Sequence, residues 1–178
     1  MFNATAMSVH NSSWRRVLAL GLLAAGSAAG ADAADHPLIG RPAPDFALRA
    51  FAGGNVRLSE HRGEVVVLEF WSSRCSTCGA QLAALNRSYA TYRTAGLTVL
   101  GISVEDSRRH AREFVQAHRV GFQMLDDPGE DVSRLYEVDS LPMLVLIDRS
   151  GTIRDVHHDF GPRDEARYLL ELRRLLDE

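Results

Sequence analysis

The run from Val65 to Trp71 is apolar at every position except Glu69, and a Cys75-Ser-Thr-Cys78 motif follows it closely. A strand that is apolar on both faces is typical of the centre of a sheet covered by helices on both sides. The pattern therefore predicts a layered α/β architecture, with the cysteine pair next to one end of its central strand.

The rest of the chain alternates strand and helix patterns, which predicts an α/β sandwich with a mixed central β-sheet between helices. The turn at Ala52-Gly53-Gly54-Asn55 joins the first two strands into an N-terminal β-hairpin extension. Strands are predicted at 45–48, 56–58, 65–71, 97–104, 122–125, 143–147 and 152–157, and helices at 80–95, 108–118, 132–136 and 165–176.

The N-terminal segment has the pattern of a secretory signal peptide. Arg15 and Arg16 precede an apolar stretch at 17–25 that is well short of the ~20 residues needed to cross a bilayer. Small residues at Ala31 and Ala33 predict cleavage after Ala33. We therefore expect a signal peptide at 1–33 and one domain at 34–178, located in the periplasm or otherwise outside the cytoplasm. An uncleaved segment that tethers the protein to the membrane is the alternative.

Composition limits the classes of partner. The chain has 178 residues, of which 46% are hydrophobic, so it can bury the core of a single domain. Its net charge of −3 offers no basic surface for a nucleic-acid backbone. We expect a monomer that needs no metal and no cofactor and does not bind nucleic acid.

Cys75 and Cys78 are the only cysteines, so they cannot form a disulfide framework and instead favour redox chemistry. A Cys75 sulfur at the first turn of a helix would face unpaired N–H groups and the positive end of the helix dipole, which stabilise a thiolate. Cys78 lies one turn further on the same face, where it is more shielded and can resolve a mixed disulfide. A static disulfide and half of a zinc site are the alternatives.

Glu69 is the second candidate, because a carboxylate within an apolar central strand is unfavourable unless it keeps its proton or has a partner. Burial would raise its pKa towards the range used in proton transfer. The alternative is a solvent-facing side chain on an edge strand.

Five motifs in the same order together resemble the thioredoxin-fold proteins of the TlpA/ResA group, within the redoxin and AhpC/TSA superfamily. They are the Gly-Arg-Pro-Ala-Pro-Asp-Phe segment at 40–46, the strand ending in Phe-Trp at 70–71, the Cys-x-x-Cys motif, Leu-Pro at 141–142 and Ile-Asp-Arg-Ser-Gly at 147–151. The resemblance covers about 37–176. It implies a thioredoxin fold and an extracytoplasmic thiol-disulfide oxidoreductase, many relatives being reductants in cytochrome c maturation or copper-site assembly.

The resemblance also implies roles for individual residues. Glu69 stands where thioredoxins carry a buried acid that exchanges a proton with the resolving cysteine, here Cys78. Pro142 stands where the fold keeps a cis proline facing the cysteines, so that the backbone of Leu141 can pair with a substrate strand. Trp71 is expected to pack near the active-site helix, mainly in the core, with part of its ring exposed in the substrate groove, which Arg74 also lines. The implied partners are cysteine-containing periplasmic proteins and a membrane or periplasmic electron donor.

The departures from the family pattern leave the direction of electron flow open. Arg74 replaces a common tryptophan and Thr77 a common proline. A guanidinium beside Cys75 would stabilise its thiolate, or it would face solvent and contact an acidic partner. Two other functions remain as alternatives: a peroxiredoxin-like peroxidase, and a copper-delivery module that combines the cysteines with His157 and His158.

Overall fold

The apolar run forms the central strand β3 (Val65–Trp71) of a seven-stranded sheet, and every residue of β3 is buried. The computed structural model describes residues 36–178. Strand β3 pairs in parallel with β4 (Leu97–Ser103) and antiparallel with β6 (Met143–Ile147). The predicted signal peptide at 1–33 lies outside the described residues, and so does its boundary with the domain.

The sheet is mixed, as predicted, with the strand order β2-β1-β5-β4-β3-β6-β7. The predicted hairpin is formed by β1 (Ala47–Ala50) and β2 (Asn55–Arg57), which pair antiparallel. The hairpin extends the sheet, because β1 also pairs antiparallel with β5 (Gln123–Asp126). At the opposite edge, β7 (Ile153–His158) pairs antiparallel with β6.

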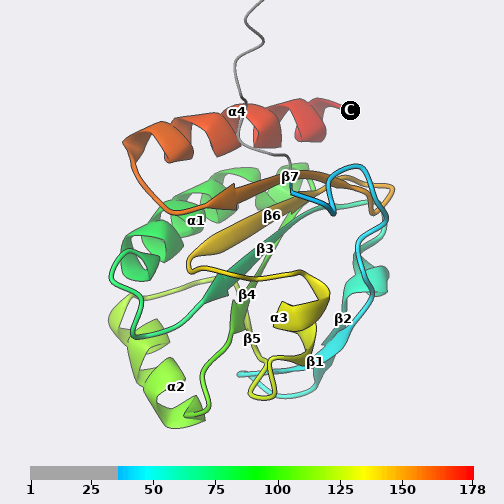
Figure 1. The fold of residues 1–178 in the computed structure, drawn as a ribbon. Helices are drawn as coiled ribbons and strands as arrows, with labels where there is room; N and C mark the ends of the chain where they lie inside the picture. The colour runs from blue at the N-terminus through cyan, green and yellow to red at the C-terminus, as the bar shows by residue number, and fades with distance from the viewer. Residues whose placement is uncertain (1–35) are drawn as a thin grey trace, which may run out of the picture. The chain divides into compact units, whose positions relative to one another are not determined.

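Four α-helices cover the sheet, namely α1 (Cys78–Tyr92), α2 (Arg108–Ala117), α3 (Asp131–Leu135) and α4 (Pro162–Asp177). Two short 3-10 helices, η1 (Leu58–His61) and η2 (Arg93–Ala95), follow β2 and α1. Gly96 ends η2 with a left-handed φ of 94°, a conformation that glycine adopts without steric cost. Figure 1 shows α1 and α4 on one side of the sheet and α3 on the other.

The two faces of the sheet build two hydrophobic cores. Because side chains alternate along a strand, β3 contributes to both of them. The first core includes Val66, Leu68, Phe70, Val132 and Tyr136, and lies beneath α3 and residues 38–46. The second includes Val65, Val67, Trp71, Cys78, Leu82, Leu85, Ala111, Tyr168 and Leu172, and lies beneath α1, α2 and α4. Cys78 is therefore part of the core under α1.

The first strand begins two residues later than predicted, because Asp45 is used as a polar anchor. Its carboxylate accepts hydrogen bonds from the Ser59 backbone N–H at 2.9 Å and from the Arg57 guanidinium at 3.0 Å. Ser59 also donates its hydroxyl to the same carboxylate. These contacts hold the end of the hairpin against η1.

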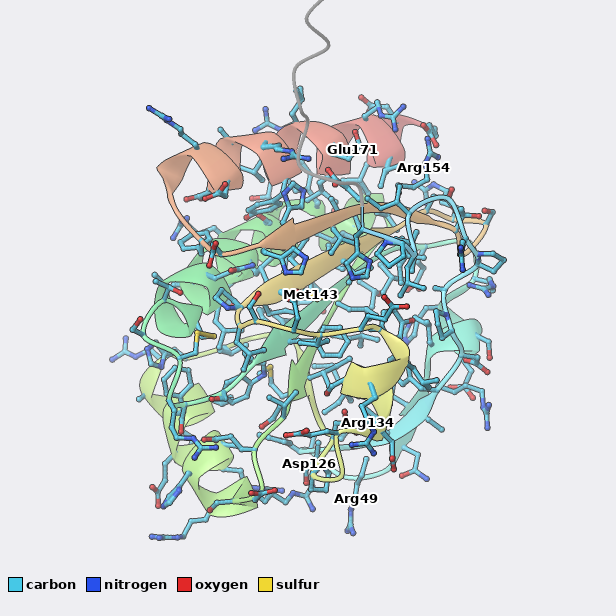
Figure 2. All side chains as sticks on the ribbon, in the orientation of Figure 1. Arg49, Asp126, Arg134, Met143, Arg154 and Glu171 are labelled. Carbon is cyan, nitrogen blue, oxygen red and sulfur yellow. A yellow bond between two sulfur atoms is a disulfide. The ribbon has the colours of Figure 1, made fainter. Side chains whose placement is uncertain are left out.

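Hydrogen bonds from Arg149, which follows β6, hold the C-terminal helix α4 against the ends of the strands. Arg149 donates hydrogen bonds to the carbonyl oxygens of Gly63, Ala95 and Leu176 at 2.9, 3.3 and 3.1 Å. Arg154 on β7, labelled with Glu171 of α4 in Figure 2, binds Asp148 at 3.1 Å. Among the described residues, the helices are too short or too polar to span a membrane.

Candidate active site

The two cysteines form a disulfide at the start of α1, with an S–S distance of 2.14 Å and Cα atoms 5.4 Å apart. Cys78 is the first residue of the helix and Thr77 is its N-cap. Cys75 thus lies just ahead of the first turn and not within it, which corrects the sequence-based expectation. The backbone N–H of Cys75 donates a hydrogen bond to the Ser72 carbonyl oxygen at 3.2 Å. This bond closes a turn in the loop between β3 and α1.

The start of α1 directs a hydrogen-bond donor at Cys75. The backbone N–H of Cys78 points to the Cys75 sulfur at an N···S distance of 3.1 Å. The Thr77 hydroxyl lies 3.8 Å from the same sulfur. No acidic residue occupies the first turn of α1, so no carboxylate offsets the positive end of the helix dipole. This arrangement stabilises negative charge on the Cys75 sulfur.

The two cysteines differ in accessibility. Cys78 is 0% exposed and packs in the core beneath α1, whereas Cys75 is partly exposed and lines a surface groove. A thiol of another protein can therefore approach the Cys75 sulfur, while the fold covers the Cys78 sulfur.

Glu69 is 0% exposed in the middle of β3. Its Oε2 atom accepts a hydrogen bond of 2.8 Å from Gln81 Nε2, while its Oε1 atom has no partner among the described residues. Burial removes water from the carboxyl group and raises the pKa of Glu69 well above its ordinary value. The alternative of a solvent-facing glutamate on an edge strand is wrong, because β3 has a paired strand on each side.

Gln81 is the site residue that sequence reasoning missed. It is buried on α1, three residues after Cys78 and so on the same face of the helix. Its Oε1 atom, like that of Glu69, is buried without a partner in the described part of the chain. A proton kept on the Glu69 carboxyl would supply the donor that these two oxygens lack. The signal available in the sequence was this three-residue spacing.

The groove beside Cys75 has a volume of about 420 Å³. Arg74 and Leu141, both expected there, line it, and Arg74 is exposed to solvent. The residues that line it are Ser72, Arg74, Cys75, Val104, Glu130, Ser133, Val138, Asp139, Ser140 and Leu141.

Pro142 follows Leu141 through a cis peptide bond, as predicted. Its side chain is buried and lies outside the set that lines the groove. The next residue, Met143, which is labelled in Figure 2, begins β6. It pairs with Phe70 of β3. The proline therefore lies where the chain enters the sheet beside the strand that leads to the cysteines.

Trp71 does not line the groove, so its expected partial exposure there is wrong, whereas its expected packing in the core near α1 is confirmed. Its side chain is 0% exposed and stacks on Phe114 of α2, with ring centroids 5.3 Å apart and an interplanar angle of 17°. Its indole nitrogen has no hydrogen-bond partner among residues 36–178. The last side chain of β3 points into the core under α1 and α2, and these helices cover it.

His157 and His158 make local contacts. His157 is 5% exposed, with Nε2 3.1 Å from Asp155 Oδ2. His158 Nδ1 lies 3.3 Å from both the Asp139 carboxylate and the Ser140 hydroxyl. Within the described residues, no three His, Cys, Asp or Glu side chains converge to hold a metal ion. The geometry thus gives no support to a joint site of the histidines with the cysteines.

Comparison with known proteins agrees with this geometry. The chain matches the family model described as "AhpC/TSA family" over residues 39–156. The thiol-disulfide oxidoreductase ResA of Geobacillus kaustophilus is 30% identical over 118 residues, covering 66% of this chain and 68% of that protein. ResA of Geobacillus thermodenitrificans is 30% identical over 133 residues, covering 75% of this chain and 76% of that protein.

Solved structures show the same fold. A crystal structure from Chlorobium tepidum, assigned as a thiol:disulfide interchange protein DsbE, superposes with a TM-score of 0.75 and 33% identity, covering 78% of this chain and 97% of that one. Together with the buried acid and the unequally exposed cysteines, these likenesses identify the activity. The chain belongs to the AhpC/TSA family, and within it is a thioredoxin-fold, TlpA/ResA-like thiol-disulfide oxidoreductase.

Proposed function

We propose that this protein acts outside the cytoplasm and exchanges its Cys75–Cys78 disulfide with cysteines of partner proteins. One observation carries the assignment of roles: the N–H of a buried Cys78 points at the sulfur of an accessible Cys75. The accessible sulfur receives the stabilising donor, so Cys75 is the atom that joins the partner and Cys78 is the atom that releases it.

In the reducing direction, the Cys75 thiolate attacks a disulfide of the partner. A mixed disulfide forms between Cys75 and one partner sulfur, and the other partner sulfur leaves as a thiolate. Cys78 then loses its proton and attacks the Cys75 sulfur, which breaks the mixed disulfide and releases the second partner thiolate. The protein ends oxidised and the partner gains two electrons. The oxidising direction is the reverse of these steps.

Glu69 is proposed to move the proton of Cys78. Its buried carboxyl group has a raised pKa and is linked by Gln81 to the face of α1 that carries Cys78. When the disulfide of this protein is opened, the Cys78 thiolate leaves and takes a proton from the Glu69 carboxyl group. When Cys78 attacks, the Glu69 carboxylate accepts the proton.

The location and the partners complete the proposal. The signal pattern at 1–33 and the likeness to ResA support an extracytoplasmic site of action. The partners we propose are periplasmic proteins with paired cysteines, such as those of cytochrome c or copper-site assembly. A membrane or periplasmic dithiol protein would supply or remove the electrons.

Trapping tests this function. Cys78→Ser, expressed with its N-terminal segment in the bacterial envelope, cannot resolve the mixed disulfide and should accumulate a Cys75-linked adduct with its partner. The adduct should disappear on treatment with dithiothreitol, and it should be absent from the matched Cys75→Ser protein. If Cys78→Ser yields no adduct, or if Cys75→Ser yields the same one, the proposed exchange is wrong.

A further inference from the structure

A second pocket shares Arg74 with the groove that contains Cys75. Its volume is about 290 Å³, and it is lined by Ser73, Arg74, Glu105, Asp106, Ser107 and His110. It lies between the loop that precedes Cys75 and the segment that connects β4 to α2. Because Arg74 lines both hollows, a partner segment lying in the cysteine groove can reach this pocket with a neighbouring side chain.

Glu105 is built into the wall of this pocket and is only 4% exposed. The Ser73 hydroxyl donates a hydrogen bond to its Oε1 atom, and its own backbone N–H donates to the Ser103 hydroxyl at 3.4 Å. Its Oε2 atom is buried with no hydrogen-bond partner in the described part of the chain. A buried carboxylate oxygen is unfavourable without a donor, and the residue that carries it lines the pocket.

Among the residues that line the pocket, carboxylates outnumber guanidinium groups. Asp106 adds an exposed second carboxylate, and Arg74 is the cation among the lining residues. His110 Nε2 lies 3.3 Å from an Arg109 guanidinium nitrogen. Arg109 is exposed and lies outside the set of residues that line the pocket. Two carboxylates and one guanidinium group therefore belong to the lining itself.

We propose that this pocket binds the lysine or arginine side chain of a substrate protein, next to the cysteine that reacts with Cys75. The inference rests on the function proposed above and names a chemical property of its substrate. An ammonium or guanidinium group would donate to Glu105 Oε2 and lie close to Asp106, forming charge-assisted hydrogen bonds. Arg74 is exposed on the shared wall, so its guanidinium can turn towards solvent when the second cation enters.

An anionic side chain is the competing ligand, because α2 begins at this pocket with Ser107 as its N-cap. The Ser107 hydroxyl already accepts the N–H of His110 at 3.4 Å. An anion would also face the carboxylates of Glu105 and Asp106. The charge distribution therefore favours a cation.

Peptide substrates that differ at one position test the proposal. Each peptide carries one cysteine as a mixed disulfide with 2-mercaptoethanol, with lysine, glutamine or glutamate at successive positions on either side of that cysteine. The reduced full-length protein is mixed with each peptide at low ionic strength, and release of the peptide thiol is followed. The readout is the rate of reduction of the lysine peptide divided by that of the glutamine peptide. This ratio cancels any effect of a substitution on the reactivity of Cys75, because that effect is the same for both peptides.

At one position, the wild-type protein should reduce the lysine peptide about tenfold faster than the glutamine peptide, as expected for a charge-assisted contact. Glu105→Gln and Asp106→Asn should each bring this ratio towards one. Asp106 is exposed, so its variant does not depend on refolding of the core. Glu113→Gln, an exposed change on α2 outside the pocket, should keep the wild-type ratio.

Three results would overturn the proposal. The first is a wild-type ratio near one at every position, and the second is a preference for the glutamate peptide. The third is a lysine preference that survives both Glu105→Gln and Asp106→Asn. Hydroxyethyl disulfide, which is small and uncharged, separates failure of this inference from failure of the exchange chemistry. If the reduced wild-type protein cannot reduce it, the reducing direction of the proposed function is wrong, and the inference, which rests on that direction, falls with it.

Discussion

Gln81 donates a hydrogen bond from Nε2 to Glu69 Oε2 at 2.8 Å, which joins the first turns of α1 to the middle of β3. This bond links a buried acid to the helix whose first residue is Cys78. In the proposed exchange, Glu69 therefore acts from within the core, whereas Cys75 lines the solvent-facing groove.

Glu69→Gln should slow thiol-disulfide exchange at neutral pH, because an amide cannot accept or return the Cys78 proton. General acid-base catalysis contributes factors of about 10² or more, so the rate should fall by at least about tenfold. The measurement is the rate of exchange with a small disulfide between pH 5 and 9. Glu60→Gln, an exposed change on η1, is the matched control. An unchanged rate across this pH range would refute the proton-transfer role.

The same variant should change how stability depends on pH. Since burial raises the pKa of Glu69 above its ordinary value of 4.5, the folded protein keeps a proton that the unfolded chain loses. The stabilisation is complete below pH 4.5 and is lost as the pH rises to the raised pKa, by up to about 1.4 kcal/mol per pH unit. Oxidised Glu69→Gln should therefore gain stability relative to oxidised wild type as the pH rises from 4.5. Urea unfolding of both proteins measures this, and parallel stability curves would contradict it.

Gly79→Ala should destabilise the start of α1, although alanine usually stabilises a helix by about 1 kcal/mol relative to glycine. A methyl group at position 79 would overlap with the imidazole of His118, whose Nδ1 atom is held 2.8 Å from the Phe114 carbonyl oxygen. We expect a loss of about 1–2 kcal/mol in the free energy of unfolding. The double variant Gly79→Ala/His118→Ala should regain part of the free energy of unfolding that Gly79→Ala loses, because the overlapping imidazole is gone. Urea unfolding of the oxidised proteins compares them, and a stable single variant would mean that His118 moves aside at little cost.

Arg74→Ala should make the midpoint potential of the Cys75–Cys78 couple more negative. Removing a guanidinium from the groove destabilises the thiolate of the reduced protein, so the disulfide becomes a weaker oxidant. Because Arg74 is exposed, its effect is screened and should be at most about 20 mV. Titration against a glutathione redox buffer measures the shift. Arg134→Ala, an exposed change on α3, should leave the potential unchanged, and a potential equally unchanged in Arg74→Ala would discard the electrostatic role.

The central strand was predictable because its pattern is local. An apolar run with one acid favours a position where both faces are covered, so residues 65–71 predicted β3 and favoured a buried Glu69 over the solvent-facing alternative. The position of the cysteines next to a helix likewise predicted that Cys78 is the more shielded of the two. The hairpin was recognised from its turn, but its pairing with β5 required the fold, since that contact joins segments more than 70 residues apart.

The errors at the site concern side-chain directions. Trp71 ends a strand that is apolar on both faces, so the pattern could not tell whether its ring enters the groove or the core. Gln81 and Glu105 gain their significance from partners on other elements, Glu69 and Ser73, which sequence spacing does not bring together. The sequence pattern therefore did not single out Gln81 or Glu105, because their contacts are made only in the folded chain.

The pairing of β1 with β5 has a consequence for association between copies of the protein. Without β1, the four residues of β5 would end the sheet and offer unpaired backbone groups to any extended polypeptide. Because β1 pairs with β5, the edge strand on this side of the sheet is β2. This strand is three residues long and carries Arg57. An edge strand this short is a poor template for β-strand pairing with another molecule. Two copies of the protein therefore have little strand edge on this side of the sheet through which to associate.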